Sequence, residues 1–145
     1  MRDCKVWWIA SVILIVGCAM AVAAEPADEA WKAYQSYRKA FAEATSMDEL
    51  VPFLAAERAA QVAETPADEK GMMFEMIKEM SMAMGDLEVV GSSVDGESVV
   101  FDVKGIQHEG DQDIPITGTV TMVREDGAFK VSRESFKMGD SSSEE

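Results

Sequence analysis

The residues best suited to unusual chemistry are the methionines of the segment Gly71–Met84. Met72, Met76 and Met80 recur every four residues, so their side chains share one face if the segment is helical. Thioethers are soft ligands for Cu(I) and Ag(I), which makes a metal-handling site one interpretation. Flexible methionines also fill hydrophobic cores or form adaptable binding surfaces. We expect the stripe to pack in the core, because a core requires apolar residues at helical spacing, and we retain the other two as alternatives.

A second polar group, Gln107–Asp113, combines the only histidine, His108, with three carboxylates. Imidazole and carboxylates together can bind a divalent cation. However, the segment lacks the spacing of a calcium-binding loop, and polar residues around Gly110 are typical of a solvated turn between strands. We therefore predict a turn here and expect no bound metal.

The sequence offers little for nucleophilic catalysis or nucleotide binding. A Ser–His–Asp triad would depend on His108, and the chain has no G-x-S-x-G motif. The ten glycines occur singly and do not form a phosphate-binding loop. We therefore assign no catalytic residue and expect no cofactor. A non-enzymatic binding protein is the favoured interpretation, and a pocket enzyme of the isomerase or lyase type is the alternative.

The first 24 residues have the three parts of a secretory signal: a basic start, an apolar centre and an exit of small residues. Cleavage after Ala23 or Ala24 would release a periplasmic or secreted protein. Alternatively, Ile15–Cys18 resembles a bacterial lipobox, in which Cys18 is lipidated and anchors the protein in the envelope. Third, the apolar run is about 20 residues long, which is enough to span a bilayer uncleaved. All three interpretations place residues 25–138 outside the cytoplasm or on a membrane surface.

The charge of the chain limits its partners. The formal net charge is −14, and it becomes −15 if residues 1–24 are removed. Such a domain repels the phosphates of nucleic acids and anionic membrane surfaces, so we expect no nucleic acid partner and membrane contact only through the N-terminus. Cys4 and Cys18 both lie in the signal segment, so the remaining chain forms no internal disulfide. An unknown protein or an apolar ligand remains the expected partner.

The residue pattern up to Met84 predicts three helices. The first spans about residues 27–44 and places Trp31, Tyr34 and Phe41 on one face. The second spans about 46–62 and opens with a capping box formed by Ser46 and Glu49. The third spans about 67–84, because a Thr-Pro-Ala-Asp start signal precedes it and a glycine follows it.

From Leu87 the apolar residues alternate, which predicts a four-stranded antiparallel meander. A first strand at 87–91 leads to a turn at residues 95–96. Two strands follow at about 98–104 and 114–122, with Pro115 expected at a strand start or a sheet edge. An Asp-Gly turn at 126–127 then leads into a last strand that continues towards Phe136. Residues 139–145 have the composition of a disordered acidic tail.

Helices followed by an antiparallel meander make an α+β domain, in which the helices pack on one face of a curved sheet. This order resembles the nuclear-transport-factor-like and cystatin-like superfamily, as found in small exported bacterial proteins of unknown function. The last hairpin, residues 119–131, carries the closest likeness, and the aromatic first helix also fits. The sequence departs from the usual pattern between Val62 and Thr65, where no short strand is evident. This departure favours a subgroup that begins with helices alone.

The resemblance implies a cone-shaped domain that encloses an apolar pocket in some members and presents a protein-binding surface in others. Its enzymes place an acid, a tyrosine or a histidine at the pocket. No such motif maps onto this sequence residue by residue. We predict that the following apolar residues line a ligand pocket or its core: Trp31, Tyr34, Phe41, Met76, Met80, Phe101 and Val120.

Overall fold

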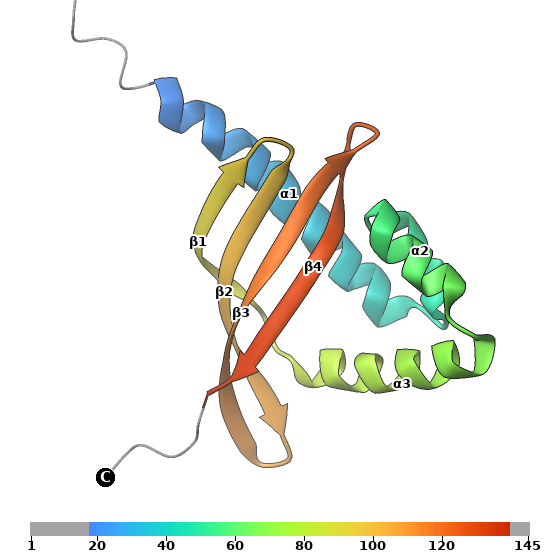
Figure 1. The fold of residues 1–145 in the computed structure, drawn as a ribbon. Helices are drawn as coiled ribbons and strands as arrows, with labels where there is room; N and C mark the ends of the chain where they lie inside the picture. Colours follow the sequence, from blue (N-terminus) through green and yellow to red (C-terminus); the bar gives the residue numbers. More distant parts are fainter. Residues whose placement is uncertain (1–17, 140–145) are drawn as a thin grey trace, which may run out of the picture.

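A computed structural model of the chain describes residues 18–139 (Figure 1). The helical segments are α1 (Cys18–Glu43), the 3-10 helix η1 (Met47–Phe53), α2 (Ala56–Glu64) and α3 (Ala67–Ala83). The strands are β1 (Glu88–Asp95), β2 (Ser98–Glu109), β3 (Gln112–Glu125) and β4 (Ala128–Met138). The predicted α+β class is confirmed, with four helical segments in place of about three. Most of the predicted signal and most of the predicted tail lie outside the described residues.

The aromatic helix α1 crosses one face of the sheet, and in Figure 1 it passes behind the strands. Its buried side chains recur every three or four residues, which gives the helix one apolar face as predicted. These residues are Ala30, Tyr34, Tyr37 and Phe41. They meet the inward-facing residues of the central strands, Val99, Phe101, Val103, Val120 and Met122. The single core therefore lies between α1 and the sheet.

The sheet is a meander in the order β1-β2-β3-β4, as the sequence predicts. The β3–β4 turn has positive φ at both central residues, 52° at Asp126 and 80° at Gly127. That backbone is the type I′ turn that Asp-Gly favours in two-residue hairpins. The first strand is longer than predicted, because β1 continues past a bulge at Val90 to Asp95.

The prediction of one continuous second helix is wrong. The chain forms η1, then two extended residues, Leu54 and Ala55, and then α2. The predicted capping box is also absent: Ser46 makes no side-chain cap, and the Glu49 carboxylate instead accepts hydrogen bonds from the backbone and hydroxyl of Thr45.

The break between η1 and α2 has a tertiary cause. The backbone N–H of Ala55 donates to the carbonyl of Val131 at 2.9 Å, and Leu54 pairs with the same residue in a parallel bridge. The segment therefore covers part of the outer edge of β4, where unpaired backbone groups would otherwise remain. Glu125 on β3 accepts from the N–H of Ala56 at 2.9 Å and so caps α2 from a distant part of the chain.

The β2–β3 hairpin extends beyond the neighbouring strands. Pairing with β1 begins at Lys104, and pairing with β4 ends at Ile116. Pro115 lies just beyond that last pair, and its carbonyl accepts from Gly139 on the β4 side. The missing N–H of the proline therefore falls where β3 has become an edge, as predicted.

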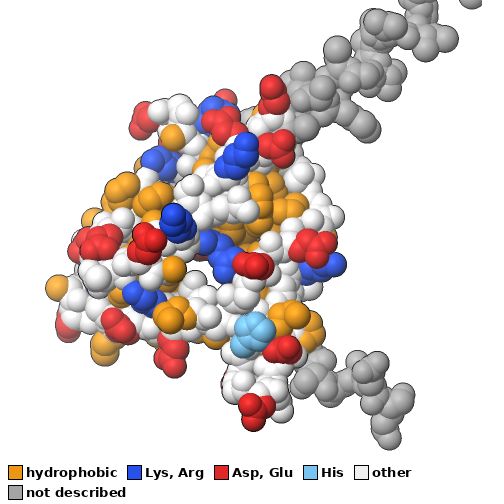
Figure 2. Space-filling view, turned by 180° about the vertical axis from the view of Figure 1, so that it is seen from behind, with side chains coloured by type: hydrophobic (Ala, Val, Ile, Leu, Met, Phe, Trp, Pro, Cys, Tyr) orange, Lys and Arg blue, Asp and Glu red, His pale blue; other side chains and the backbone are white. Residues whose placement is uncertain are grey.

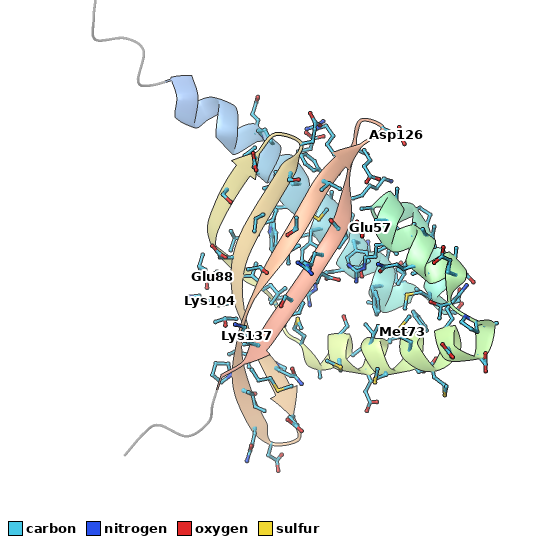
Figure 3. All side chains as sticks on the ribbon, viewed as in Figure 1. Glu57, Met73, Glu88, Lys104, Asp126 and Lys137 are labelled. Atoms are coloured by element: carbon cyan, nitrogen blue, oxygen red, sulfur yellow. The ribbon has the colours of Figure 1, made fainter. Side chains whose placement is uncertain are left out.

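The other face of the sheet carries no helix among residues 18–139 and is polar. Lys104 and Lys137 lie on this face, on β2 and β4, and Figure 3 labels both. Glu88 on β1 forms an ion pair with Lys104 at 3.3 Å. Within residues 18–139, no helix combines the length and the apolar character needed to cross a membrane.

Gly118 on β3 allows β4 to approach closely. A Cβ atom at this position would collide with the carbonyl oxygen of Ser135 and lie 2.5 Å from the ring of Phe136. We expect Gly118→Ala to lower the free energy of unfolding by about 1–3 kcal/mol, as overpacking in cores does. Urea denaturation measures this change.

The matched control is Gly71→Ala on α3, where an added Cβ meets nothing within 4 Å. This variant should raise the free energy of unfolding by about 0.5–1 kcal/mol, because alanine favours a helix interior over glycine. Equal effects of the two substitutions would contradict the close approach of β4 to Gly118.

Candidate functional site

The candidate site begins with two tyrosines on the buried face of α1. Tyr34 and Tyr37 are 1% and 4% exposed, and their ring centroids are 6.0 Å apart. Phe41 continues the series with a ring centroid 5.9 Å from that of Tyr37. The spacing of three and four residues places all three side chains toward the sheet. Buried tyrosine hydroxyls require a hydrogen-bond partner, and the sheet supplies one.

That partner is Glu134, which a β-bulge in β4 turns toward α1. Val131 pairs with Met122, whereas Arg133 pairs with the preceding residue of β3, Thr121, so Ser132 is the extra residue. A bulge shifts the alternation of side chains by one position. Without this bulge, Glu134 would point to the opposite, polar face of the sheet. The bulge therefore creates the polar part of the site.

Three side chains from two helices donate to the Glu134 carboxylate. The Tyr34 hydroxyl lies 2.9 Å from Oε1, and the Tyr37 hydroxyl lies 3.4 Å from Oε2. Arg58 on α2 donates through Nη2 to Oε2 at 3.0 Å and forms an ion pair with the same carboxylate. Hydrogen bonds to a charged acceptor are stronger than those between neutral groups, so this cluster joins α1, α2 and β4.

The two hydroxyls remain donors over a wide pH range. Burial is the largest cause that raises the pKa of Tyr34 and of Tyr37 above the ordinary value of 10.0, and the negative charge of Glu134 raises both further. A tyrosinate at either position would be desolvated and would face a carboxylate. Both residues therefore act as neutral hydroxyl groups in the folded protein.

A small cavity adjoins this cluster between α1, α3 and β4. Its volume is about 180 Å³, and its lining is mostly apolar. α1 contributes Tyr34, Tyr37, Arg38 and Phe41; α3 and the residue after it contribute Ile77, Met80, Ser81 and Met84; β4 contributes Glu134 and Phe136. The cavity is comparable to an engineered apolar cavity of about 150 Å³ that binds benzene.

Arg38 separates this cavity from a wider hollow. Its Nη2 donates to the carbonyl of Gly85 at 3.1 Å, just beyond the end of α3. The wider hollow has a volume of about 710 Å³ and is lined by Trp31, Lys39 and Asp86 among others, and Arg38 lines both spaces. Figure 2, seen from the helical side, shows that the surface is hollowed near its centre. A guanidinium therefore lies where the apolar cavity meets this hollow.

Four of the predicted pocket residues line these spaces. Tyr34, Phe41 and Met80 line the cavity, and Trp31 lines the wider hollow with Phe41. Phe101 and Val120 are buried in the core, 2% and 0% exposed. Nothing bound identifies a ligand at any of these positions, so their binding role stays a prediction.

The prediction that the methionine stripe packs in the core is wrong. Met72, Met76 and Met80 are 69%, 58% and 50% exposed. The inner face of α3 is occupied instead by Phe74 and by Met73, which Figure 3 labels and which packs against the core. A single helix cannot bury two faces against the same sheet, so the remaining methionines lie in solvent.

The polar segment around His108 is a hairpin end, as predicted. Gly110 and Asp111 form the turn, and the His108 Nδ1 lies 2.6 Å from the carboxylate of Asp113 on the facing strand. Residues 18–139 contain no group of three or more His, Cys, Asp or Glu that could hold a metal ion.

The sequence reasoning missed Glu134, Arg38 and Arg58. A signal for Glu134 was present, because the apolar residues of the last strand change from odd positions, Phe129 and Val131, to an even one, Phe136. That change of parity indicates a bulge between them. Arg38 and Arg58 carried no comparable signal, since single arginines on helices are usually exposed.

No protein-family model matches the chain, and no curated protein sequence is significantly similar to it. The solved structures that the chain matches include the following two. A dehydratase candidate of the NTF2-like family from Streptomyces avermitilis is 10% identical, with a TM-score of 0.50 over 81% of this chain and 99% of its own. A SEC-C motif containing protein from Rhodopseudomonas palustris is 16% identical, with a TM-score of 0.45 over 70% of each chain. The first similarity supports the NTF2-like α+β fold that the sequence resembles, and it concerns the fold alone.

The tyrosines provide a test of the site, because the chain has only two and both donate to Glu134. Their folded-state pKa values are raised above the ordinary 10.0, so the stability that they contribute is present below pH 10 and is lost above it. We expect no tyrosinate absorbance near pH 10 while circular dichroism remains native. The urea-unfolded chain is the control and should ionise near the ordinary value. Half-complete ionisation at that pH in the native state would contradict the hydrogen-bonded cluster.

Proposed function

We propose that this chain is a small exported binding protein of a bacterial envelope, without catalytic activity of its own. Its cavity takes a small apolar molecule that carries a carboxylate group. The observation that carries this proposal is the apolar cavity of about 180 Å³ with Arg38 at its boundary. A space of this size suits a ligand of on the order of six carbon atoms, by comparison with the benzene-sized cavity of about 150 Å³.

The charges around the cavity favour an anion. Glu134 faces the cavity, but Arg58 compensates its charge at 3.0 Å. Arg38 lines the cavity and donates hydrogen bonds only through Nη2 among the contacts of residues 18–139. Its other N–H groups can therefore pair with a carboxylate, which a guanidinium binds in a planar, two-pronged geometry.

The arrangement of Glu134 favours binding over proton transfer. A general base must reach the substrate with an oxygen that is free to accept the proton. Here Tyr34, Tyr37 and Arg58 donate to the carboxylate, so three of its roughly four acceptor positions are already used. The isomerase or lyase alternative would depend on the one position left at Oε1, so we infer that Glu134 orients the helices and shapes the cavity.

Export is supported by the first 24 residues and by the start of the domain. α1 runs through Pro26, which cannot donate a backbone hydrogen bond inside a helix. Cleavage after Ala24 would place this proline in the first turn, where proline is favoured, with Asp28 and Glu29 close behind it. A lipid anchor at Cys18 would retain the same domain at a membrane surface.

Ligand binding can be tested with hexanoate and its neutral analogue, 1-hexanol, by NMR of 13C-labelled methionine methyl groups in the full chain. We expect hexanoate to shift Met80 and Met84, which line the cavity, and to leave Met72 and Met82 unchanged. Arg38→Met should weaken hexanoate binding by about ten- to a hundredfold, because a charge-assisted hydrogen bond contributes about 1.5–3 kcal/mol. Binding of 1-hexanol should change little.

The matched control is Lys32→Met, which removes the same charge from an exposed position of α1. Its affinity for hexanoate should stay close to that of the original chain. If both substitutions weakened hexanoate binding equally, the loss of affinity would come from long-range electrostatics. That result would contradict a carboxylate site at Arg38.

The export proposal predicts a shortened or modified N-terminus. Mass spectrometry of the protein from a bacterial host should find either a chain that begins at Ala24 or Glu25, or a diacylated chain that begins at Cys18. An intact N-terminus on cytoplasmic protein would overturn export. An intact N-terminus in the membrane fraction would instead identify the uncleaved anchor.

A further inference from the structure

The outer face of α3 presents an unusual surface of thioethers. Three large side chains, which we call the methionine face, are 58–73% exposed: Met72, Met76 and Met82. Exposed apolar side chains in a contiguous group commonly mark an interaction site. Methionine is suited to such a site, because its flexible and polarizable side chain adapts to different partner surfaces.

Carboxylates lie beside these methionines and outnumber the two lysines of α3. Asp68, Glu69, Glu75 and Glu79 are all exposed. Lys70 instead forms an ion pair with Asp48 at 3.0 Å on η1, and its side chain is 18% exposed. The Lys78 ammonium donates to the carbonyl of Ala44 and lies 5.5 Å from the centroid of the Phe74 ring. The ammonium groups of both lysines are therefore already paired within the domain, and the exposed face of α3 combines thioethers with an excess of negative charge.

A hollow runs along this helix and provides space for a partner. Its volume is about 740 Å³, and its lining consists of Thr45, Phe74, Glu75, Met76, Lys78, Glu79 and Met82. In Figure 2, hydrophobic and acidic side chains lie next to each other over α3, at the lower left. The surface is thus recessed and apolar, with two carboxylates against one lysine, whose ammonium is bonded to the Ala44 carbonyl.

We propose that the methionine face binds a basic amphipathic helix of a partner protein. The apolar side of such a helix would pack on Met72, Met76 and Met82, and its lysines or arginines would pair with Glu75 and Glu79. α3 has 17 residues and is about 25 Å long, so it can support a partner helix of about four turns. Amphipathic helices that insert into apolar grooves are a common mode of peptide recognition.

The charge of the chain argues against other occupants of this face. A second copy would bring a net charge of −14 and a second row of carboxylates against the first. Like charges in contact are destabilising across an interface. An anionic membrane surface would be repelled for the same reason. A positively charged, amphipathic partner is the occupant that satisfies both the methionines and the carboxylates.

The proposal can be tested on the full chain with a synthetic peptide that carries leucines on one helical face and lysines on the other. Fluorescence anisotropy gives the affinity, and NMR of 13C-labelled methionine methyl groups locates the contact. We expect shifts at Met72, Met76 and Met82. Replacing these three methionines together by glutamine should weaken binding about tenfold or more, because their burial contributes most of the apolar contact. Glu75→Gln with Glu79→Gln should weaken binding and reduce its dependence on salt.

The matched control variant is Ile106→Gln with Met138→Gln, two exposed apolar residues on the sheet. It should bind the peptide as the original chain does. A peptide with the same leucine face and glutamates in place of lysines should not bind. The proposal is overturned if the control variant weakens binding equally, if the glutamate peptide binds as well, or if the methionine face instead mediates a dimer in solution. Hexanoate binding is independent of this result, since Met72, Met76 and Met82 do not line the cavity.

Discussion

The hydrogen bonds that Glu134 accepts from Tyr34 and Tyr37 determine how the helical layer lies on the sheet. Apolar packing alone would leave α1 free to slide or rotate, because hydrophobic contact is not directional. Two buried hydroxyls with one acceptor fix both the position and the rotation of the helix. Arg58 brings α2 to the same carboxylate, so one residue of β4 sets the placement of two helices. The cavity exists because α1 is held in this position while α3 diverges from the sheet.

Contacts between distant elements also determine how the basic residues of the domain are used. The structured helices have no basic residue in their last turns, where unpaired carbonyl groups accumulate. Other elements supply the cations: Lys78 donates to Ala44 just past α1, Arg38 to Gly85 just past α3, and Lys130 to Pro52 within η1. A cation at the carboxyl end of a helix also interacts favourably with the helix dipole. The chain has 27 acidic and 13 basic residues, so using these three cations at helix ends adds to an acidic excess that the composition already sets.

The sequence contains enough information for the fold class and for most of the elements. The alternation from Leu87 onward predicts the meander, and the Asp-Gly turn at 126–127 fixes its last hairpin, since that turn geometry requires positive φ. The aromatic spacing of α1 likewise predicts its buried face. The break before Ala56 could not be predicted, because the hydrogen bond from Ala55 to Val131 joins residues 76 positions apart. Local propensity describes neighbours along the chain and not such tertiary contacts.

The candidate site shows where pattern reasoning reaches its limit. The last strand changes parity between Val131 and Phe136, so the bulge that exposes Glu134 to the core is encoded locally, and attention to parity would have found it. α3 is different in kind. It carries apolar residues on more than one face, with Phe74 and Ile77 on one and Met72 and Met76 on another, so periodicity cannot decide which face is buried. Which face of α3 is buried depends on the limited apolar surface that α1, η1 and the sheet offer to it. That surface exists only in the assembled domain. The core has room for only one face of α3, so the methionines on the other face stay exposed. For the same reason they remain available to a partner.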